Sequence, residues 1–251
     1  NLSATSSTSG ATFTWSGPNS FSATGATASI TSATTAASGT YTVIAKLNGC
    51  TSLPGTVNVT VNAIPATPTV ASNSPICSGT NLNLTSSGVT GTTTYNWTGP
   101  NSFTSSNANP IITAATTVAT GTYNLTITQN GCTSASSSVS VVVNAVPVIS
   151  NPTPSNPTTC ATPTGSITLN GLLSNTAYSV SYTFNSATQT VTITSNASGQ
   201  VIISGLASGT YSNITVALNT CISTAVGPIS LSDPNPPATP VASVLVSPIC
   251  A

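Results

Sequence analysis

Six cysteines are the side chains of this sequence with the most chemistry open to them. They lie far apart and never as Cys-x-x-Cys, at Cys50, Cys77, Cys132, Cys160, Cys221 and Cys250. Zinc sites and thioredoxin-type redox sites need closely spaced cysteines, so this spacing favours disulfides instead. Because disulfides persist in oxidising compartments, the cysteines predict a secreted protein that lies outside the cell or on its surface.

Charged side chains are almost absent. The 251 residues include one Lys or Arg, one Asp or Glu and no His, and the two charges are Lys46 and Asp233. General acid–base catalysis and activation of a hydroxyl nucleophile both need such groups in pairs, so we predict no enzyme, no cofactor and no metal site. The same scarcity argues against a nucleic-acid partner, and no apolar run reaches the roughly 20 residues of a membrane span.

The elements that must position these cysteines follow from an internal repeat. The stretch Trp15–Phe21 (WSGPNSF) returns as Trp97–Phe103 (WTGPNSF), 82 residues later, and the same register carries Gly-Thr-Tyr, Asn-Gly-Cys and Val-Asn-Ala. Apolar residues alternate with polar ones, and Gly-Pro-Asn, Asn-Gly and Ser-Gly separate the alternating segments. This pattern predicts short antiparallel strands joined by turns, arranged as a small sandwich in each repeat.

We therefore predict an all-β chain of tandem immunoglobulin-like antiparallel β-sandwich modules in a string. Residues 1–64 would be a module lacking its first strand, 65–146 a complete module, 147–236 a divergent module and 237–251 the first strand of a further module. In the complete module, the strands are expected at 69–72, 81–86, 93–98, 109–113, 121–128 and 136–144.

Five aromatic residues are expected in the sandwich cores. They are Trp15, Trp97, Tyr41, Tyr123 and Tyr211. Each tryptophan lies in an alternating strand beside another aromatic residue, which favours packing over a sugar-stacking surface. Tyr123 follows Gly-Thr at the start of a late strand, where a tyrosine corner bonds its hydroxyl to the preceding turn.

The two ends of the chain resemble the two parts of one module. Residues 237–250 repeat the pattern of residues 65–77, including Ser-Pro-Ile-Cys. We expect the apolar residues of this segment to serve as a donated strand: Val241, Val244, Val246 and Ile249. Two arrangements remain open, a window from a long covalent array and separate subunits that exchange this strand.

These motifs resemble the immunoglobulin-like and PKD-like repeats of giant secreted surface proteins of Bacteroidota, including gliding-motility adhesins. The resemblance covers the first two repeats and the segment at 238–250, and the third repeat only in part. It implies secretion by the type IX route and a role in adhesion or in surface filaments. It implies no catalytic residues.

The favoured function is a structural module of an extracellular filament or stalk, whose partners are identical copies joined head to tail. The alternative is a ligand-binding adhesin repeat that contacts surface glycans. We expect disulfides Cys77–Cys132 and Cys160–Cys221, each closing one end of a module. Cys50 is expected to pair across a repeat or subunit boundary with the equivalent of Cys250.

Overall fold

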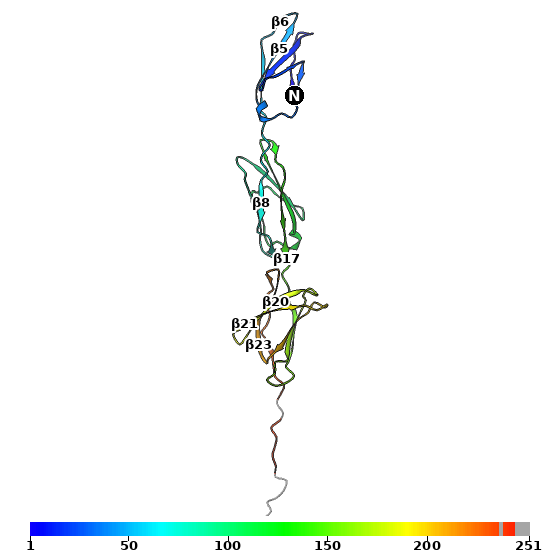
Figure 1. Cartoon of the computed structure of the whole chain (residues 1–251), viewed down its shortest axis with the longest axis vertical. Coiled ribbons are helices and arrows are strands. Elements are labelled where there is room, and N and C mark those ends of the chain that lie inside the picture. Colours follow the sequence, from blue (N-terminus) through cyan, green and yellow to red (C-terminus); the bar gives the residue numbers. More distant parts are fainter. Residues whose placement is uncertain (236–237, 244–251) are drawn as a thin grey trace, which may run out of the picture. The chain divides into compact units, whose positions relative to one another are not determined.

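The chain is all-β. The computed structural model describes residues 1–235 and 238–243, which form β-strands and two short 3-10 helices (Figure 1). The strands pair within three successive groups, which we call the first module (β1–β7), the second module (β8–β17) and the third module (β18–β25). By packing, the described chain divides into one unit of residues 1–73, 83–111 and 121–141, and another of residues 74–82, 112–120 and 142 onward.

The second module has the strand pairing of an immunoglobulin-like sandwich. One sheet has the order β13-β10-β8, the other has the order β12-β11-β14-β15 with β16 also on β14, and β17 pairs with β9 in parallel. Its elements are β8 Thr69–Ser72, β9 Ile76–Cys77, β10 Leu82–Ser87, β11 Thr94–Gly99, β12 Phe103–Ser105, β13 Ile111–Ile112, η2 Thr117–Ala119, β14 Gly121–Gln129, β15 Cys132–Thr133, β16 Ser137–Val141 and β17 Val143–Asn144. The core between the sheets contains Leu82, Leu84, Trp97, Tyr123, Leu125 and Ile127.

The predicted strands of this module agree with the structure to within one or two residues, apart from the last one. The expected strand 136–144 is broken at Val142, whose N–H bonds to the Ser74 hydroxyl at 2.7 Å. The chain there leaves the antiparallel ladder with β14 and begins the parallel ladder with β9. Period-two alternation runs through both segments, so the sequence pattern could not show this change of partner.

The first module repeats this arrangement from β10 onward. Its elements are β1 Leu2–Ser3, β2 Thr12–Gly17, β3 Phe21–Thr24, β4 Thr27–Ala28, η1 Thr35–Ala37, β5 Gly39–Leu47, β6 Cys50–Thr51 and β7 Gly55–Val59. One sheet has the order β3-β2-β5-β6 with β7 also on β5, and the other consists of β1 and β4. β1 corresponds to Leu84 and Thr85, the middle of β10, in the repeat register.

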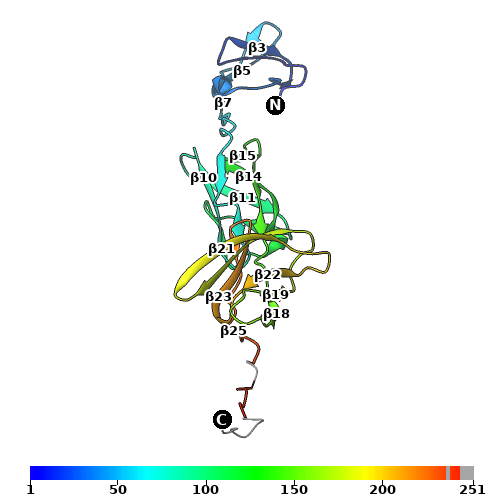
Figure 2. The same cartoon turned by 60° about the horizontal axis from the view of Figure 1, so that its bottom comes forward.

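The third module is a sandwich that lacks tryptophan. Its elements are β18 Ser150–Ser155, β19 Gly165–Asn170, β20 Ala177–Phe184, β21 Ala187–Thr194, β22 Val201–Leu206, β23 Gly209–Leu218, β24 Cys221–Ile222 and β25 Ile229–Leu231 (Figure 2). The predicted hairpin around Asn185-Ser186 joins β20 to β21, and both turn residues have positive φ, as a type I′ turn requires. Tyr211 fills the core here, stacked on Phe184 with ring centroids 4.6 Å apart.

Candidate functional site

The candidate site is the edge of the first module formed by β1 and the residues beside it. Leu2 and Ser3 pair with Ala28 and Thr27 of β4, and these two strands make a sheet of their own. In the second module, the equivalent strand β10 is central, with β8 paired along its other side from Leu84 to Ser87. The first module therefore presents a short strand edge where the second module has a complete sheet.

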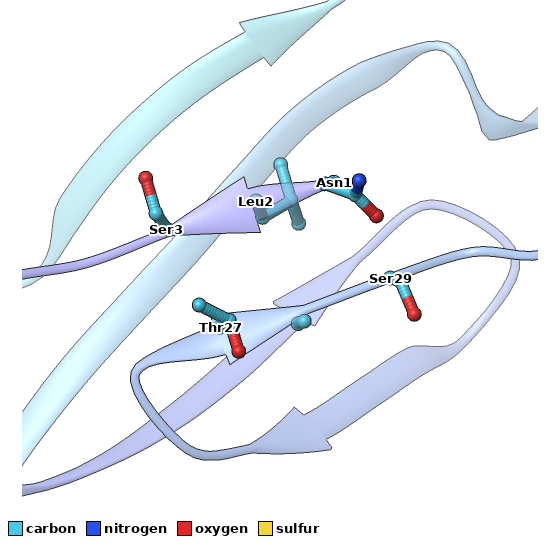
Figure 3. Close-up of a pocket in the computed structure, with 6 residues that line it drawn as sticks. Asn1, Leu2, Ser3, Thr27 and Ser29 are labelled. Carbon is cyan, nitrogen blue, oxygen red and sulfur yellow. The ribbon is translucent and has the colours of Figure 1, made fainter.

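A hollow of about 410 Å³ lies at this edge (Figure 3). Its lining is Asn1, Leu2 and Ser3 from one strand with Thr27, Ala28 and Ser29 from the other. Backbone groups and small polar side chains dominate the lining, and it includes no His, Cys, Asp, Glu, Lys or Arg. Such a surface suits main-chain hydrogen bonding to another strand rather than catalysis.

Beside it lies an apolar hollow of about 160 Å³ that reaches the core. It is lined by Asn1, Leu2, Ile30, Ala33, Ala37, Tyr41, Val59 and Val61. The equivalents of Val59 and Val61 in the second module are Val141 and Val143, which are only 1% and 4% exposed. Val59 and Val61 are half-buried, so part of the first module's apolar core surface borders the hollow.

Val61-Asn62 are the repeat equivalents of Val143-Asn144, which form a paired strand in the second module. The Val61 N–H donates to the Ser38 hydroxyl at 2.9 Å, and Val143 makes the same bond to Thr120. Val143-Asn144 form β17 and pair in parallel with Ile76-Cys77, whereas Val61-Asn62 lie outside any strand. The first module as described thus has no counterpart of β9 beside Val61-Asn62.

The disulfide of the described chain joins Cys77 to Cys221, with their Cα atoms 5.5 Å apart. Cys77 lies on β9 of the second module and Cys221 on β24 of the third. The expected bridges Cys77–Cys132 and Cys160–Cys221 are therefore wrong. Among the described residues, Cys50, Cys132 and Cys160 are free thiols, and Cys250 lies outside the described residues.

Strand register explains why Cys77 and Cys132 do not pair. Cys132 is opposite Gln129 at one end of β14, whereas Val141 is opposite Gly121 at the other end. β17 begins at Val143, two residues after Val141, and Asn144 of β17 pairs with Cys77. Eight residues of strand at about 3.3 Å each separate the two ends of β14, far beyond the roughly 7 Å Cα separation that a disulfide allows.

The predicted aromatic residues lie inside the modules. Trp15, Trp97, Tyr41, Tyr123 and Tyr211 are at most 2% exposed. The Trp15 indole N–H donates to the Gly25 carbonyl at 3.0 Å, and the hydroxyls of Tyr41 and Tyr211 donate to carbonyls four residues upstream. Both tryptophan rings are thus buried, which leaves them no exposed face for a sugar.

Burial also affects two of these phenols. Desolvation raises the pKa of Tyr123 above its ordinary value. Desolvation, followed by the neighbouring Tyr182 phenol, raises the pKa of Tyr211. Both side chains therefore stay neutral in the folded chain, as core residues do.

The repeated WxGPNSF stretch is explained by packing. A Cβ at Gly17 would lie 2.4 Å from the Tyr41 ring, and one at Gly99 equally close to the Tyr123 ring. Phe21 then meets Tyr41 edge to face at 5.3 Å, after a turn in which Asn19 and Ser20 both have positive φ. The motif therefore builds the cores of the first and second modules.

Gly17→Ala is expected to destabilise the first module by about 1–3 kcal/mol, because the added methyl must displace the buried Tyr41 ring. Thermal unfolding of the two variants Gly17→Ala and Gly55→Ala checks this. Gly55 lies in the same sheet, and a Cβ there would make only an ordinary contact with Val43 at 3.4 Å. Equal melting temperatures for the two variants would contradict the packing role of Gly17.

The two charged side chains do not form a site. Asp233 accepts a hydrogen bond from the Ser208 hydroxyl at 3.0 Å, and Lys46 lies on β5 in the first module. Within residues 1–235 and 238–243, no group of three His, Cys, Asp or Glu could hold a metal. None of the helices in this part of the chain is long and apolar enough to cross a membrane.

Most residues of the predicted donated strand lie outside the described residues. Val241 is 93% exposed, while Val244, Val246 and Ile249 lie outside the described residues. Sequence reasoning missed Asn62, whose side-chain amide donates to the Asn130 carbonyl at 2.9 Å and whose own carbonyl lies 3.7 Å from the Cys132 sulfur. The repeated Val-Asn pair at 61–62 and 143–144 was the signal that could have identified it.

Comparison with known proteins gives similar structures but no family. No family model matches the chain, and no curated protein matches it. The chain is similar to a three-immunoglobulin segment of titin carrying Glu-to-Ala changes, at 14% identity over 86% of this chain and 88% of that one, with a TM-score of 0.46. It is similar to murine CEACAM1b at 18% identity, covering 66% and 99%, with a TM-score of 0.40. A two-domain fibronectin type III segment of chicken tenascin gives 14% identity, 65% and 98% coverage and a TM-score of 0.35. These TM-scores are all below 0.5. We therefore assign the immunoglobulin-like fold from the strand pairing within the modules.

Proposed function

We propose that this chain is a structural unit of an extracellular filament or stalk, assembled head to tail by completion of its first module. The observation that carries the proposal is the edge at β1 and Val61, where the second module has β8 and β9. An exposed strand edge beside an apolar hollow favours addition of a further strand, because both main-chain hydrogen bonds and buried apolar area are gained.

The occupant that we infer is the segment of residues 237–250 from another copy. Its sequence repeats that of residues 65–77, which form β8 and β9 in the second module. Aligned on Pro-Ala-Thr-Pro at its start and on Ser-Pro-Ile-Cys at its end, with one extra residue between them, it would pair antiparallel with Leu2–Thr5 and parallel with Val61-Asn62. Separate subunits and a covalent tandem array would use this same contact, and each gives a heterologous, head-to-tail assembly.

Residues 1–64, 65–146 and 147–236 would then be the three modules of one repeat, and 237–251 would belong to the next. The Cys77–Cys221 disulfide supports an extracellular location, since such bonds persist in oxidising compartments. The near absence of ionisable side chains supports a structural rather than a catalytic role.

Val61→Asp tests the acceptor side in the full chain. A carboxylate placed at the apolar hollow should weaken assembly at least tenfold, because strand addition would bury the charge without a partner. Sedimentation of purified chains across a concentration series measures this, with Thr60→Asp at the neighbouring exposed position as the control. Equal assembly by the two variants would refute the proposed acceptor.

A further inference from the structure

We propose that two disulfides join neighbouring copies, one between Cys160 of one copy and Cys50 of the next and one between Cys250 of the first and Cys132 of the next. This inference rests on the proposed head-to-tail function and adds the covalent chemistry of the contact. Its template is the Cys77–Cys221 bond, which joins the second module to the third within one chain.

Each side of the template bond has a recognisable local structure. In the second module, the Ser74 hydroxyl accepts a hydrogen bond from the Val142 N–H at 2.7 Å. Asn144, two residues after Val142, pairs with Cys77. On the third module, Cys221 closes a tight hairpin opposite Leu218. We call these two structures the exit end and the hairpin end of a module.

The exit end of the third module repeats that of the second. The Asn156 side chain accepts a hydrogen bond from the Ser232 N–H at 3.0 Å, as Ser74 does from Val142. The Cys160 sulfur lies 3.6 Å from the Pro234 carbonyl, two residues beyond Ser232. By these contacts Cys160 corresponds to Cys77. Cys160 is an exposed free thiol, so it can reach a partner outside its module.

The hairpin end of the first module repeats that of the third. Cys50 is opposite Leu47, after two turn residues with positive φ, as Cys221 is opposite Leu218. The Ser52 hydroxyl accepts from the Ala45 N–H at 3.0 Å, and Ser223 accepts from Val216 at 3.1 Å. The free thiol of Cys50 is exposed beside a hollow of about 260 Å³.

The contact of Asn62 with Cys132, between the first and second modules, indicates where the second disulfide would form. The Cys132 sulfur lies 3.7 Å from the Asn62 carbonyl, and Asn62 is the repeat equivalent of Asn144, the residue opposite Cys77. A strand added opposite Asn62 with the sequence Ser-Pro-Ile-Cys would therefore bring its cysteine to Cys132. Cys250 ends that sequence in residues 247–250.

Each bond forms by a balanced two-electron oxidation. The two thiols lose two protons and two electrons, and a new S–S bond forms between them. The oxidant is a disulfide, such as oxidised glutathione or a disulfide oxidoreductase, whose own S–S bond is broken and which leaves as two thiols.

The test is disulfide mapping of chains assembled in a glutathione redox buffer, alkylated and digested with pepsin at acidic pH. We expect linked peptides that contain Cys50 with Cys160 and Cys132 with Cys250, in addition to Cys77 with Cys221. A Cys50–Cys250 link, or alkylated Cys50 and Cys160 in assembled material, would overturn the inference. The same peptides are expected whether the copies are separate or covalently continuous.

Two double variants of the 251-residue chain provide the second readout. Cys160→Ser/Cys250→Ser should convert multiples of 24.6 kDa on non-reducing denaturing gels into single 24.6 kDa chains. Cys77→Ser/Cys221→Ser should keep the multiples, because it removes only the bond within one copy. If native assemblies of the wild-type chain release single chains in denaturant without reductant, the intersubunit disulfides are refuted but the proposed function is not. If no assembly forms at all, the proposed function is refuted as well.

Discussion

Removal of residues 237–251 is expected to abolish head-to-tail assembly and leave single copies in solution. The deleted segment is the only stretch that repeats the sequence of β8 and β9 outside the second module. Without it, the edge at Leu2 and Val61 has no strand of matching sequence to add. Sedimentation velocity of the full and shortened chains under identical conditions measures the loss.

Two controls separate the sequence of this segment from its length. A chain in which residues 238–250 become Gly and Ser should also remain single, since glycine-rich segments favour flexible coil over strand. A synthetic peptide with the sequence of residues 237–250 should bind the shortened chain with one site per copy. Assembly that survives the deletion would contradict the proposed strand exchange.

Trp97→Ala is expected to destabilise the second module by about 3–5 kcal/mol, because its large ring is fully buried and its removal leaves a cavity. Calorimetry should show one transition moved to lower temperature. The chain has two tryptophans, so the fluorescence of Trp15 in this variant reports the first module and should be unchanged.

Thr98→Ala, at the next and exposed position of β11, serves as the control and should shift the transition little. This pair also addresses the adhesin alternative. Loss of binding to a glycan array by Trp97→Ala, with stability unchanged, would contradict the core role of this side chain.

Much of the fold could be predicted because each repeat encodes its strands locally. Alternation located the strands of the second module, and Asn-Gly-Cys and Asn185-Ser186 located turns whose residues have positive φ. The short strands β9, β12 and β15 were missed. Two or three residues are too few for alternation to be recognised.

The disulfide partners could not be predicted from position in the sequence. Cys77 and Cys132 belong to the same repeat, and only the ladders on β14 and β17 show that they lie at different ends of the strands. Cys77 and Cys221 are 144 residues apart and belong to different repeats, so a prediction made module by module could not pair them.

The candidate site was predictable in outline. The repeat between residues 65–77 and 237–250 is enough to suggest a donated strand from the amino-acid sequence alone. The edge that we propose as the acceptor could not be predicted, because the bond from Val61 to Ser38 and the contact of Asn62 with Cys132 depend on three-dimensional packing.

Amide hydrogen exchange at the edge of the first module tests strand completion most directly. Alternate amides of a strand face opposite neighbours, and the N–H groups of Ala4 and Val61 are already bonded within the first module. In assembled material, the backbone amides of Ser3, Thr5 and Asn62 should therefore exchange much more slowly than in chains that lack residues 237–251. The equivalent amides of Thr85, Ser87 and Asn144 serve as internal controls and should not change, because β8 and β9 already pair with these strands. Equal exchange at Ser3, Thr5 and Asn62 in the two samples would contradict completion of the first module by another copy.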